Sequence, residues 1–502
     1  MFVYNTLSGK KTLLLPRKKN TLKLFVCGAT VYDLSHIGHA RTYIFFDFFA
    51  RYLRARGFKV FYLQNITDID DRVIARARTL KKKPETLAAN FTKEYLKDMA
   101  SLGIESVNVY APATKFISQI ISQIERLIKK GYAYKIENDL PTGQAGGWYY
   151  DIKKFKDYGR LSNRTVAQAE DAVSRIDENK NKRNKGDFAL WKFVKSRINA
   201  NTSTNEREYE MKIINGEPAW NTPLGWGRPG WHIEDTAISE HYFGPQYDIH
   251  GSAVDLKFPH HEAEIAQQEG ASGPPANEFA RRRSRAGKKP MVKIWMHAGF
   301  LLIDGKKMSK SLNNFITIKD LLKKYEPGVL RLMILSHHYR SPLNFSAKLA
   351  EQTKTSFSGL AEFMSKLDFV GKARNGKGRN LRMEKIIKEN EKAFHKALEN
   401  DLNTPLALAR VFALASEFQN KIWNLGDAEA KILKNHLEKM LKMLGLEIKT
   451  PKIPKKIRAL ALKRELLRVN KQFVQADALR KKIWGLGYKV DDTPRGQFVT
   501  LK

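Results

Sequence analysis

The strongest constraint on the fold is a strand–helix–strand pattern near the start of the chain. Residues 22–27, LKLFVC, have the apolar character of a short buried strand, and a glycine-containing loop leads from them to a helix over about residues 39–56. The apolar side chains of this helix recur at helical spacing, and Gly57 stands where a C-terminal cap belongs. The stretch KVFYLQNIT then reads as a second strand. The pattern therefore predicts a parallel unit of the nucleotide-binding type.

The rest of the chain divides into an interrupted α/β part and a helical part. Helical segments fill about 85–130, and the irregular, polar sequence between about 135 and 220 predicts an inserted subdomain. Strand and helix patterns return with YDIHGSAVDLKFPHHEAEIAQQEG and, after a basic loop, with IWMHAGFLLIDGKKMSKS. Beyond about 347 the periodicity is helical, until the joint KTPKIPKK separates a last basic segment. We expect a parallel sheet that is split by an insertion and followed by an α-helical region.

The balance of charge indicates a polyanionic partner. The chain has 89 Lys and Arg against 52 Asp and Glu, a formal net charge of +37. This charge favours association with nucleic acid, although a lysine-rich proteome or adaptation to salt would also produce it. The chain has no run of about eighteen apolar residues and no secretory signal, so we expect a cytoplasmic protein that does not span a membrane. A single cysteine, Cys27, agrees with a reducing compartment.

Two short motifs are suited to binding a nucleoside triphosphate. The tetrad HIGH at residues 36–39 stands at a loop-to-helix junction, where two imidazoles, the helix dipole and close backbone approach at Gly38 favour phosphate oxygens. The sequence KMSKS at 307–311 forms a basic, hydroxyl-bearing loop, and Lys310 can neutralise the charge that develops as pyrophosphate leaves. Each motif alone is a weak signal. Together, in this order and each beside a strand, they resemble the class I aminoacyl-tRNA synthetases, which activate an amino acid as an adenylate on a Rossmann-type core.

A third group of residues is suited to binding a metal ion. The stretch FPHHEAEIAQ places His260 and Glu264 four residues apart, hence on one face of a helix, and GRPGWHIEDTAIS adds the carboxylate of Asp235. With Cys27 these side chains offer one sulfur, one nitrogen and two carboxylates. Such a set of ligands is compatible with a tetrahedral zinc site.

Longer stretches resemble the cysteinyl-tRNA synthetase family along nearly the whole chain. They are VCGATVYDLSHIGHARTYIFFD, NITDIDDRVI, DFALWK, GRPGWHIE, DLKFPHHEAEIAQ, KMSKSLNNF and HYRSPLNFS. The resemblance implies a zinc ion that binds the substrate thiolate and so separates cysteine from serine. Its ligands in the family are Cys, Cys, His and Glu, which here implies Cys27, His260 and Glu264, with Asp235 in place of the second cysteine. Because Asp can bind zinc through one oxygen, we expect zinc to be kept; the alternatives are a different metal, or loss of the metal.

The resemblance also implies roles in binding cysteine and ATP. Trp231 forms a wall of the amino-acid pocket, with Thr67 nearby and Cys27 at its base, and Asp255 holds the adenosine ribose. Mg²⁺ accompanies ATP. The residues implied in phosphate binding and catalysis, as donors and cations and not as nucleophiles, are His36, Gly38, His39, Lys307 and Lys310.

The C-terminal segment is suited to contact with RNA. Residues 451–502 contain 14 Lys and Arg against 4 Asp and Glu, with aromatic residues between them. Cations bind phosphates, and an aromatic face or a carboxylate can read an unstacked base. The anticodon-binding region of the family carries Trp-x-x-x-Asp-Ala-x-Arg, which here implies Phe473, Asp477 and Arg480, with Phe in place of Trp.

The resemblance therefore implies a monomeric ligase that forms a carbon–oxygen bond between L-cysteine and tRNA(Cys) at the expense of ATP. Two alternatives are a mycothiol-type ligase that joins cysteine to an amino sugar and lacks the anticodon-binding end, and a non-catalytic RNA-binding relative. The role of the basic loop at 281–289 stays open. The expected regions are the first half of the catalytic domain (1–134), an inserted connective subdomain (135–220), the second half of the catalytic domain (221–320), a stem-contact linker (321–346), a tRNA-binding helical bundle (347–450) and a basic anticodon-binding region (451–502).

Overall fold

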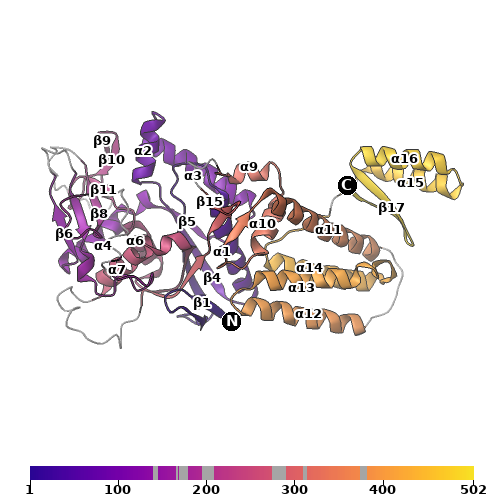
Figure 1. Cartoon of the computed structure of the whole chain (residues 1–502), viewed down its shortest axis with the longest axis horizontal. Coiled ribbons are helices and arrows are strands. Elements are labelled where there is room, and N and C mark those ends of the chain that lie inside the picture. The colour runs from indigo at the N-terminus through magenta and orange to yellow at the C-terminus, as the bar shows by residue number, and fades with distance from the viewer. Residues whose placement is uncertain are drawn as a thin grey trace. The chain divides into compact units, whose positions relative to one another are not determined.

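The structure of the chain, a computed structural model, consists of two compact units (Figure 1). The first unit comprises Met1–Lys324 and Tyr339–Asn344, and the second comprises Tyr325–His338 and Phe345–Lys502. No helix among the described residues is long and apolar enough to cross a membrane. The residues that the structure describes are 1–138, 145–165, 168, 179–194, 209–273, 290–308, 314–372, 381–450 and 452–502.

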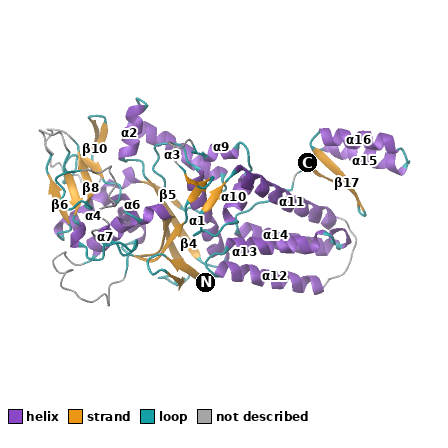
Figure 2. Ribbon diagram, viewed as in Figure 1, coloured by secondary structure: helices purple, strands orange, loops and turns teal. Residues whose placement is uncertain are grey.

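The first unit is built on a parallel sheet. Its five strands, in the order β13-β12-β3-β4-β5, are β3 (Thr21–Val26), β4 (Lys59–Ile66), β5 (Val109–Pro112), β12 (Tyr247–Ala253) and β13 (Val292–Ala298). The helix α1 (Ile37–Ala55) connects β3 to β4, so the predicted strand–helix–strand unit is confirmed. Because β4 pairs with one side of β3 and β12 with the other, the strand order reverses beside β3. Of this sheet, β4 and β5 are labelled in Figure 2, where strands are orange and helices purple. Open parallel sheets bind ligands at such a reversal, outside the carboxyl ends of the strands.

Both ends of α1 are capped. The helix begins at Ile37, earlier than predicted, because His36 is its N-cap: the Nδ1 atom of His36 accepts from the N–H of Gly38 at 3.1 Å and of His39 at 3.3 Å. Beyond the other end, Gly57 has a φ of +88°, a conformation that favours glycine. The C-terminal cap predicted at Gly57 is confirmed.

The apolar face of α1 packs directly on the sheet. Phe45, Phe46, Phe48 and Phe49 are buried, and each such side chain contributes about 1.5–3 kcal/mol on transfer from water. A Cβ atom on Gly251 of β12 would lie 2.3 Å from the ring of Phe46. A glycine at this position therefore lets the helix approach the strand closely.

Further helices and short hairpins complete the core of the first unit. The helices are α2 (Asp71–Thr79), α3 (Pro84–Ser101), α4 (Ile117–Lys129), α6 (Ile233–Phe243), α7 (His260–Ser272) and α9 (Ile318–Leu322), with the 3-10 turns η1 (Ala113–Phe116), η2 (Ile152–Lys154) and η4 (Val254–Lys257). The short strands are β1 (Phe2–Asn5), β2 (Lys10–Leu13), β14 (Leu301–Ile303), β15 (Lys306–Lys307) and β16 (Leu343–Phe345), of which the last residue, Phe345, belongs to the second unit.

A second, antiparallel sheet lies between α4 and α6 in the sequence. Its six strands, in the order β6-β7-β8-β11-β10-β9, are β6 (Ala133–Ile136), β7 (Gly147–Tyr150), β8 (Phe188–Phe193), β9 (Met211–Ile214), β10 (Glu217–Trp220) and β11 (Gly227–Pro229). Ion pairs connect this sheet to α2, because Asp71 contacts both Arg228 on β11 and Lys192 on β8. These partly buried ion pairs therefore hold the inserted sheet to α2, the helix that follows β4 of the parallel sheet.

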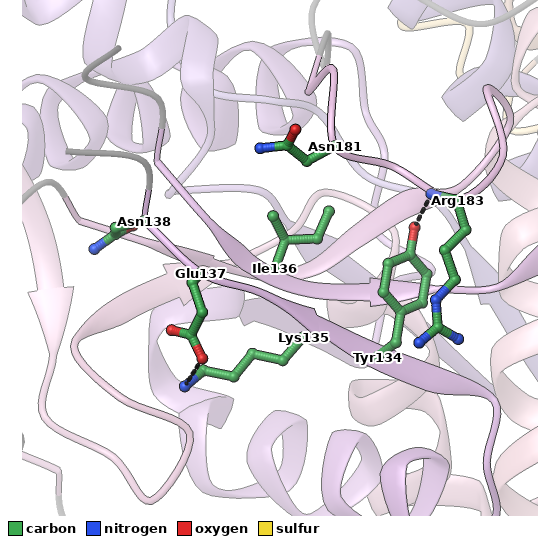
Figure 3. Close-up of a pocket in the computed structure, with 7 residues that line it drawn as sticks. All are labelled: Tyr134, Lys135, Ile136, Glu137, Asn138, Asn181 and Arg183. Carbon is green, nitrogen blue, oxygen red and sulfur yellow. Dashed lines mark hydrogen bonds and ion pairs between the residues drawn. The ribbon is translucent and has the colours of Figure 1, made fainter. Parts of the chain in front are cut away.

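The edge strand β6 of this second sheet lines an open pocket of about 470 Å³ (Figure 3). In it, the guanidinium of Arg183 lies 4.2 Å from the centre of the Tyr134 ring, and Lys135 and Glu137 form an ion pair at 2.7 Å. None of the residues predicted to bind substrate or metal lines this pocket. Its lining residues are Tyr134, Lys135, Ile136, Glu137, Asn138, Asn181 and Arg183.

The second unit is helical, as predicted, except for a hairpin at its end. Val490 and Phe498, on the two facing strands of the hairpin, are buried, and the helical periodicity of this region did not indicate these strands. Its helices are α10 (Pro327–Leu335), α11 (Ala347–Lys372), α12 (Leu381–Glu399), α13 (Thr404–Gln419), α14 (Asp427–Met443), α15 (Lys455–Val469) and α16 (Phe473–Gly485), with the 3-10 turn η5 (Ile422–Asn424), and the hairpin strands are β17 (Tyr488–Thr493) and β18 (Gly496–Leu501).

A buried carboxylate on α1 generates a prediction about stability. Asp47 accepts hydrogen bonds from the N–H groups of Glu105 at 3.1 Å and Ser106 at 3.0 Å, and from Arg51 at 2.8 Å. Asp47→Ala leaves these buried donors without their acceptor, so we expect a loss of about 3 kcal/mol in the free energy of unfolding of the first unit. Urea unfolding followed by tryptophan fluorescence measures it.

The matched control is Glu105→Ala. The carboxylate of Glu105 pairs with the same Arg51 at 3.0 Å, but its side chain is 70% exposed, so its removal costs less than about 1 kcal/mol. Equal losses for the two variants would contradict the role given to Asp47.

Candidate active site

The structure brings together the four residues that were predicted to bind metal. Cys27 follows the carboxyl end of β3, Asp235 lies in the first turn of α6, and His260 and Glu264 lie one turn apart on α7. Their candidate ligand atoms all lie within 4.8 Å of one another, and all four side chains are buried. We refer to these four residues as the acidic cluster.

The acidic cluster places two carboxylates beside an imidazole in the protein interior. The Nε2 atom of His260 lies 3.1 Å from Asp235 Oδ2 and 2.9 Å from Glu264 Oε1. Burial opposes a charged imidazole, but the charge of Glu264 and the hydrogen bonds to both carboxylates outweigh it and raise the pKa of His260 to about 10. Burial, and then the charges of Glu264 and Asp235, raise the pKa of the Cys27 thiol well above its usual value. The environment therefore favours a positive charge at this point.

The donor atoms of the acidic cluster also fit a divalent metal. Glu264 Oε2 is buried and accepts no hydrogen bond from the described residues, and its neighbour His250 Nε2 lies 3.3 Å away, so this oxygen is available to a metal ion. A thiolate, an imidazole and two carboxylates are ligands that zinc accepts in a tetrahedral site.

Two histidines that the sequence analysis did not single out contact the same sulfur. The Nε2 atoms of His250 and His261 each lie 3.2 Å from Cys27 Sγ, and with Glu264 they form a second group of possible ligands. Burial lowers the pKa of both histidines well below its usual value, so both are neutral. The sequence position of His261, directly after the predicted ligand His260, could have indicated that it lies near the site. His250 has no such indication, because only the folded sheet brings it to the cysteine.

The other ring nitrogens of these two histidines are held as well. His250 Nδ1 lies 2.6 Å from the hydroxyl of Tyr247, and His261 Nδ1 lies 2.9 Å from His297 Nε2. His297 in turn contacts Thr6 at 2.8 Å. Both imidazoles that face Cys27 are thus fixed in orientation by a chain of hydrogen bonds.

The two residues predicted to line the cysteine pocket adjoin the acidic cluster. The ring of Trp231 is only partly buried and stacks on His260, with 4.6 Å between ring centres. Thr67, which follows β4, is buried, and its hydroxyl donates to the carboxylate of Glu234. Trp231 therefore forms a side wall next to the cluster, whereas Thr67 lies beneath the surface.

The geometry of the HIGH tetrad determines which nitrogens of its histidines carry a proton. His36 Nδ1 accepts from two backbone N–H groups of α1, and His39 Nδ1 accepts from the N–H of His36 at 3.3 Å. The remaining nitrogen, Nε2, is therefore the protonated one in each neutral ring. The rings stack with 3.7 Å between centres, and burial, followed by the electrostatic effect of the neighbouring His36 imidazole, lowers the pKa of His39 well below its usual value. His39 is thus a neutral hydrogen-bond donor beside a helix N-terminus.

The described flanks of the KMSKS sequence lie against the HIGH tetrad. A Cβ atom on Gly38 would lie 3.7 Å from the terminal methyl of Met308, and the ring of Phe315 lies 5.4 Å from that of His36. Lys307 is exposed on β15, whereas Lys310 lies outside the described residues, as does the basic loop 281–289. The fold therefore joins two motifs that are distant in the sequence.

Tyr43 on α1 links the two parts of the site. Its hydroxyl donates to the backbone oxygen of Cys27 at 3.3 Å, and its ring stacks with that of His39, with 6.2 Å between centres.

Asp255, the residue predicted to hold the adenosine ribose, lies exposed in η4, directly after β12. The acidic cluster, the HIGH tetrad and Asp255 therefore share the carboxyl edge of the sheet, where the strand order reverses.

The residues predicted to contact tRNA lie on one helix of the second unit. Phe473, Asp477 and Arg480 are all exposed on α16, and the ring-bearing side chain of Phe473 is 54% accessible. Their spacing of four and three residues places them on one face.

Known proteins share both the sequence and the fold of this chain. A family model described as tRNA synthetases class I (C) catalytic domain matches residues 14–355, and a DALR domain model matches residues 393–449. Among solved structures, a LeuRS–tRNA–LeuAMS complex from Agrobacterium radiobacter has a TM-score of 0.59 at 10% identity, covering 86% of this chain and 85% of that chain. Methionyl-tRNA synthetase of Mycobacterium tuberculosis with methionyl-adenylate has a TM-score of 0.55 at 13% identity, covering 84% and 89%. These two similarities concern the fold alone.

Curated relatives are similar over almost the whole length. The cysteine–tRNA ligase of Thermoplasma volcanium is 40% identical, and that of Persephonella marina is 38% identical, each over 98% of this chain and 98% of the relative. The catalytic-domain model covers more than half of the chain, and the described residues have the parallel sheet and the helical region that this model leads one to expect. The chain therefore belongs to the cysteine–tRNA ligase family of class I aminoacyl-tRNA synthetases.

Proposed function

We propose that this chain joins L-cysteine to tRNA(Cys) at the carboxyl edge of its parallel sheet. The observation that carries the proposal is the meeting of the acidic cluster with the HIGH tetrad, joined through Tyr43, whose hydroxyl bonds the Cys27 backbone and whose ring stacks with His39. The cluster suits a thiol substrate, and the tetrad suits the phosphates of ATP. Family membership agrees with this function.

Cys27, Asp235, His260 and Glu264 are the residues that would hold one zinc ion. When bound, zinc supplies a soft acceptor that prefers the thiolate of cysteine to the hydroxyl of serine. Trp231, stacked on His260, would cover one side of the substrate and exclude water from it.

The first step forms cysteinyl-adenylate. The carboxylate of cysteine attacks the α-phosphorus of ATP, a new oxygen–phosphorus bond forms, and the bond to the pyrophosphate oxygen breaks. Neutral His36 and His39 donate from Nε2 to phosphate oxygens, Gly38 allows close approach of the backbone, and Mg²⁺ accompanies ATP. Lys307 and Lys310 supply positive charge as pyrophosphate leaves. Positioning and charge stabilisation provide the acceleration, and no protein nucleophile takes part.

The second step transfers cysteine to RNA. The 2′-hydroxyl of the terminal adenosine of tRNA(Cys) attacks the carbonyl of the adenylate, and AMP leaves while Asp255 holds its ribose. The exposed face of Phe473, Asp477 and Arg480 on α16 would contact the anticodon by stacking and hydrogen bonds. We expect a monomer that works in the cytoplasm, and the division into six functional regions stays a prediction.

Charging of tRNA(Cys) in vitro tests the function. We expect ATP-dependent attachment of cysteine, with release of AMP and pyrophosphate, because both substrates meet at one edge of the sheet. An enzyme that joins cysteine to an amino sugar would show cysteine-dependent pyrophosphate exchange without charging. A non-catalytic RNA-binding protein would bind tRNA without exchange. Either outcome would overturn the proposal.

Metal analysis tests the acidic cluster. We expect about one zinc per chain in the purified protein, and little zinc in Cys27→Ser, because Cys27 is the single cysteine of the chain. The variant should also lose discrimination between cysteine and serine, measured by pyrophosphate exchange with each amino acid. A protein almost free of metal that still activates cysteine would contradict the zinc site.

Pyrophosphate exchange also tests the HIGH tetrad. His39→Ala removes a donor to the phosphates, so we expect the cysteine-dependent exchange rate to fall by about 10²–10³ while tRNA binding stays nearly intact. The control is His241→Ala, which changes an exposed histidine on α6. Normal exchange in the His39 variant would remove it from the mechanism.

A further inference from the structure

The acidic cluster differs from the family pattern in one ligand, and that difference creates a structural requirement. A thiolate has one sulfur acceptor, whereas the carboxylate of Asp235 has two oxygens. Asp235 is only 1% exposed, so water cannot satisfy the oxygen that does not face the cluster. A buried acceptor without a donor destabilises the arrangement by about 1–3 kcal/mol.

Asn65, at the end of β4, meets this requirement. Its Nδ2 atom donates to Asp235 Oδ1 at 2.5 Å, and its side chain is 1% exposed. The other oxygen of the carboxylate, Oδ2, faces His260 Nε2 at 3.1 Å. The two oxygens of Asp235 therefore have different partners.

The orientation of the Asn65 amide is determined by its surroundings. Its Oδ1 atom accepts from the N–H of Gly28 at 2.6 Å, and a backbone N–H can only donate. A reversed amide would place two donors against each other at Gly28 and two acceptors against each other at Asp235. Asn65 thus connects Asp235, a member of the acidic cluster, to the backbone of Gly28, the residue that follows Cys27.

We propose that Asn65 is the positioning residue that makes Asp235 a one-oxygen metal ligand in place of a cysteine. It holds Oδ1 away from the metal, so that Oδ2 alone points at the position shared with Cys27, His260 and Glu264. This inference rests on the proposed zinc site. With a cysteine at position 235 no second acceptor exists at that residue, so the bond from Asn65 to position 235 is lost, and Nδ2 keeps only its longer contact with Thr67 Oγ1 at 3.4 Å.

A double-mutant cycle on the full-length protein tests the proposal. Its members are the unchanged chain, Asn65→Leu, Asp235→Cys and the double variant, and the readout is the zinc dissociation constant from competition with a chromophoric chelator. Asn65→Leu also removes the bond to Gly28, but that loss is common to both backgrounds and cancels in the cycle. We expect Asn65→Leu to weaken zinc binding by about 10–100-fold in the unchanged chain and by less than about threefold in the Asp235→Cys background.

Cobalt substitution gives a second readout, because the visible spectrum of bound Co²⁺ reports coordination number and geometry. We expect Asn65→Leu to change this spectrum with Asp235 present and to leave it unchanged in the Asp235→Cys background. Circular dichroism establishes that each variant folds, and Asn65→Ser repeats the cycle if the leucine variant does not.

The outcomes distinguish the proposed zinc site from the positioning role of Asn65. An unchanged chain that binds no zinc overturns the proposed zinc site and this inference with it. An unchanged chain that binds zinc, with equal effects of Asn65→Leu in both backgrounds, overturns the positioning role alone.

Discussion

The burial of charge at the acidic cluster is the constraint on which the first unit depends. Two carboxylates, a thiol and an imidazole offer ligand atoms within 4.8 Å of one another in the protein interior, and each uncompensated ion there costs several kcal/mol. Their carriers are the end of β3 and two helices, α6 and α7, that come much later in the chain. A parallel sheet brings these groups together, because β3 and β12 end at the same edge. Cys27 follows β3, α7 comes after β12, and the first turn of α6, which leads into β12, lies at this edge as well. The contacts of Asn65 with Asp235 and of His250 with Cys27 then hold these two candidate metal ligands in place.

The same edge of the sheet explains how the HIGH tetrad combines structure with binding. His36 caps α1 with the nitrogen that faces the backbone, and this bond leaves the opposite nitrogen protonated. His36 thus caps the helix and also presents its Nε2–H as a possible donor to a phosphate at the helix N-terminus, where the dipole favours negative charge. Tyr43, one turn further along, connects the helix to the backbone of Cys27. Helix formation, the proposed phosphate binding and the position of the cysteine therefore all depend on one short segment.

The parts of the site that could be predicted are those with a local signature. Cys27 was identified as the single cysteine of the chain and through the family resemblance, and His260 and Glu264 through helical spacing, which places that pair on one face without tertiary information. Asp235 was found through the motif around it. His250 and His261 were missed, because a histidine in a strand and a second histidine in a pair have no pattern of their own. Asn65 was missed for a similar reason, since an amide at a strand end has many possible partners until the opposite carboxylate is known.

The sequence by itself determined the parallel strand–helix–strand unit, the helical second half and the kinds of atoms offered to a metal and to phosphates. Periodicity and short motifs carry this information, because they depend on neighbours a few residues apart. Only the tertiary structure decided which nitrogen of each histidine is protonated, which oxygen of Asp235 faces the acidic cluster, and that the flanks of KMSKS lie against His36 and Gly38. These are questions of direction between groups that are far apart in the chain, and they are answered only when buried donors and acceptors must be paired in one interior.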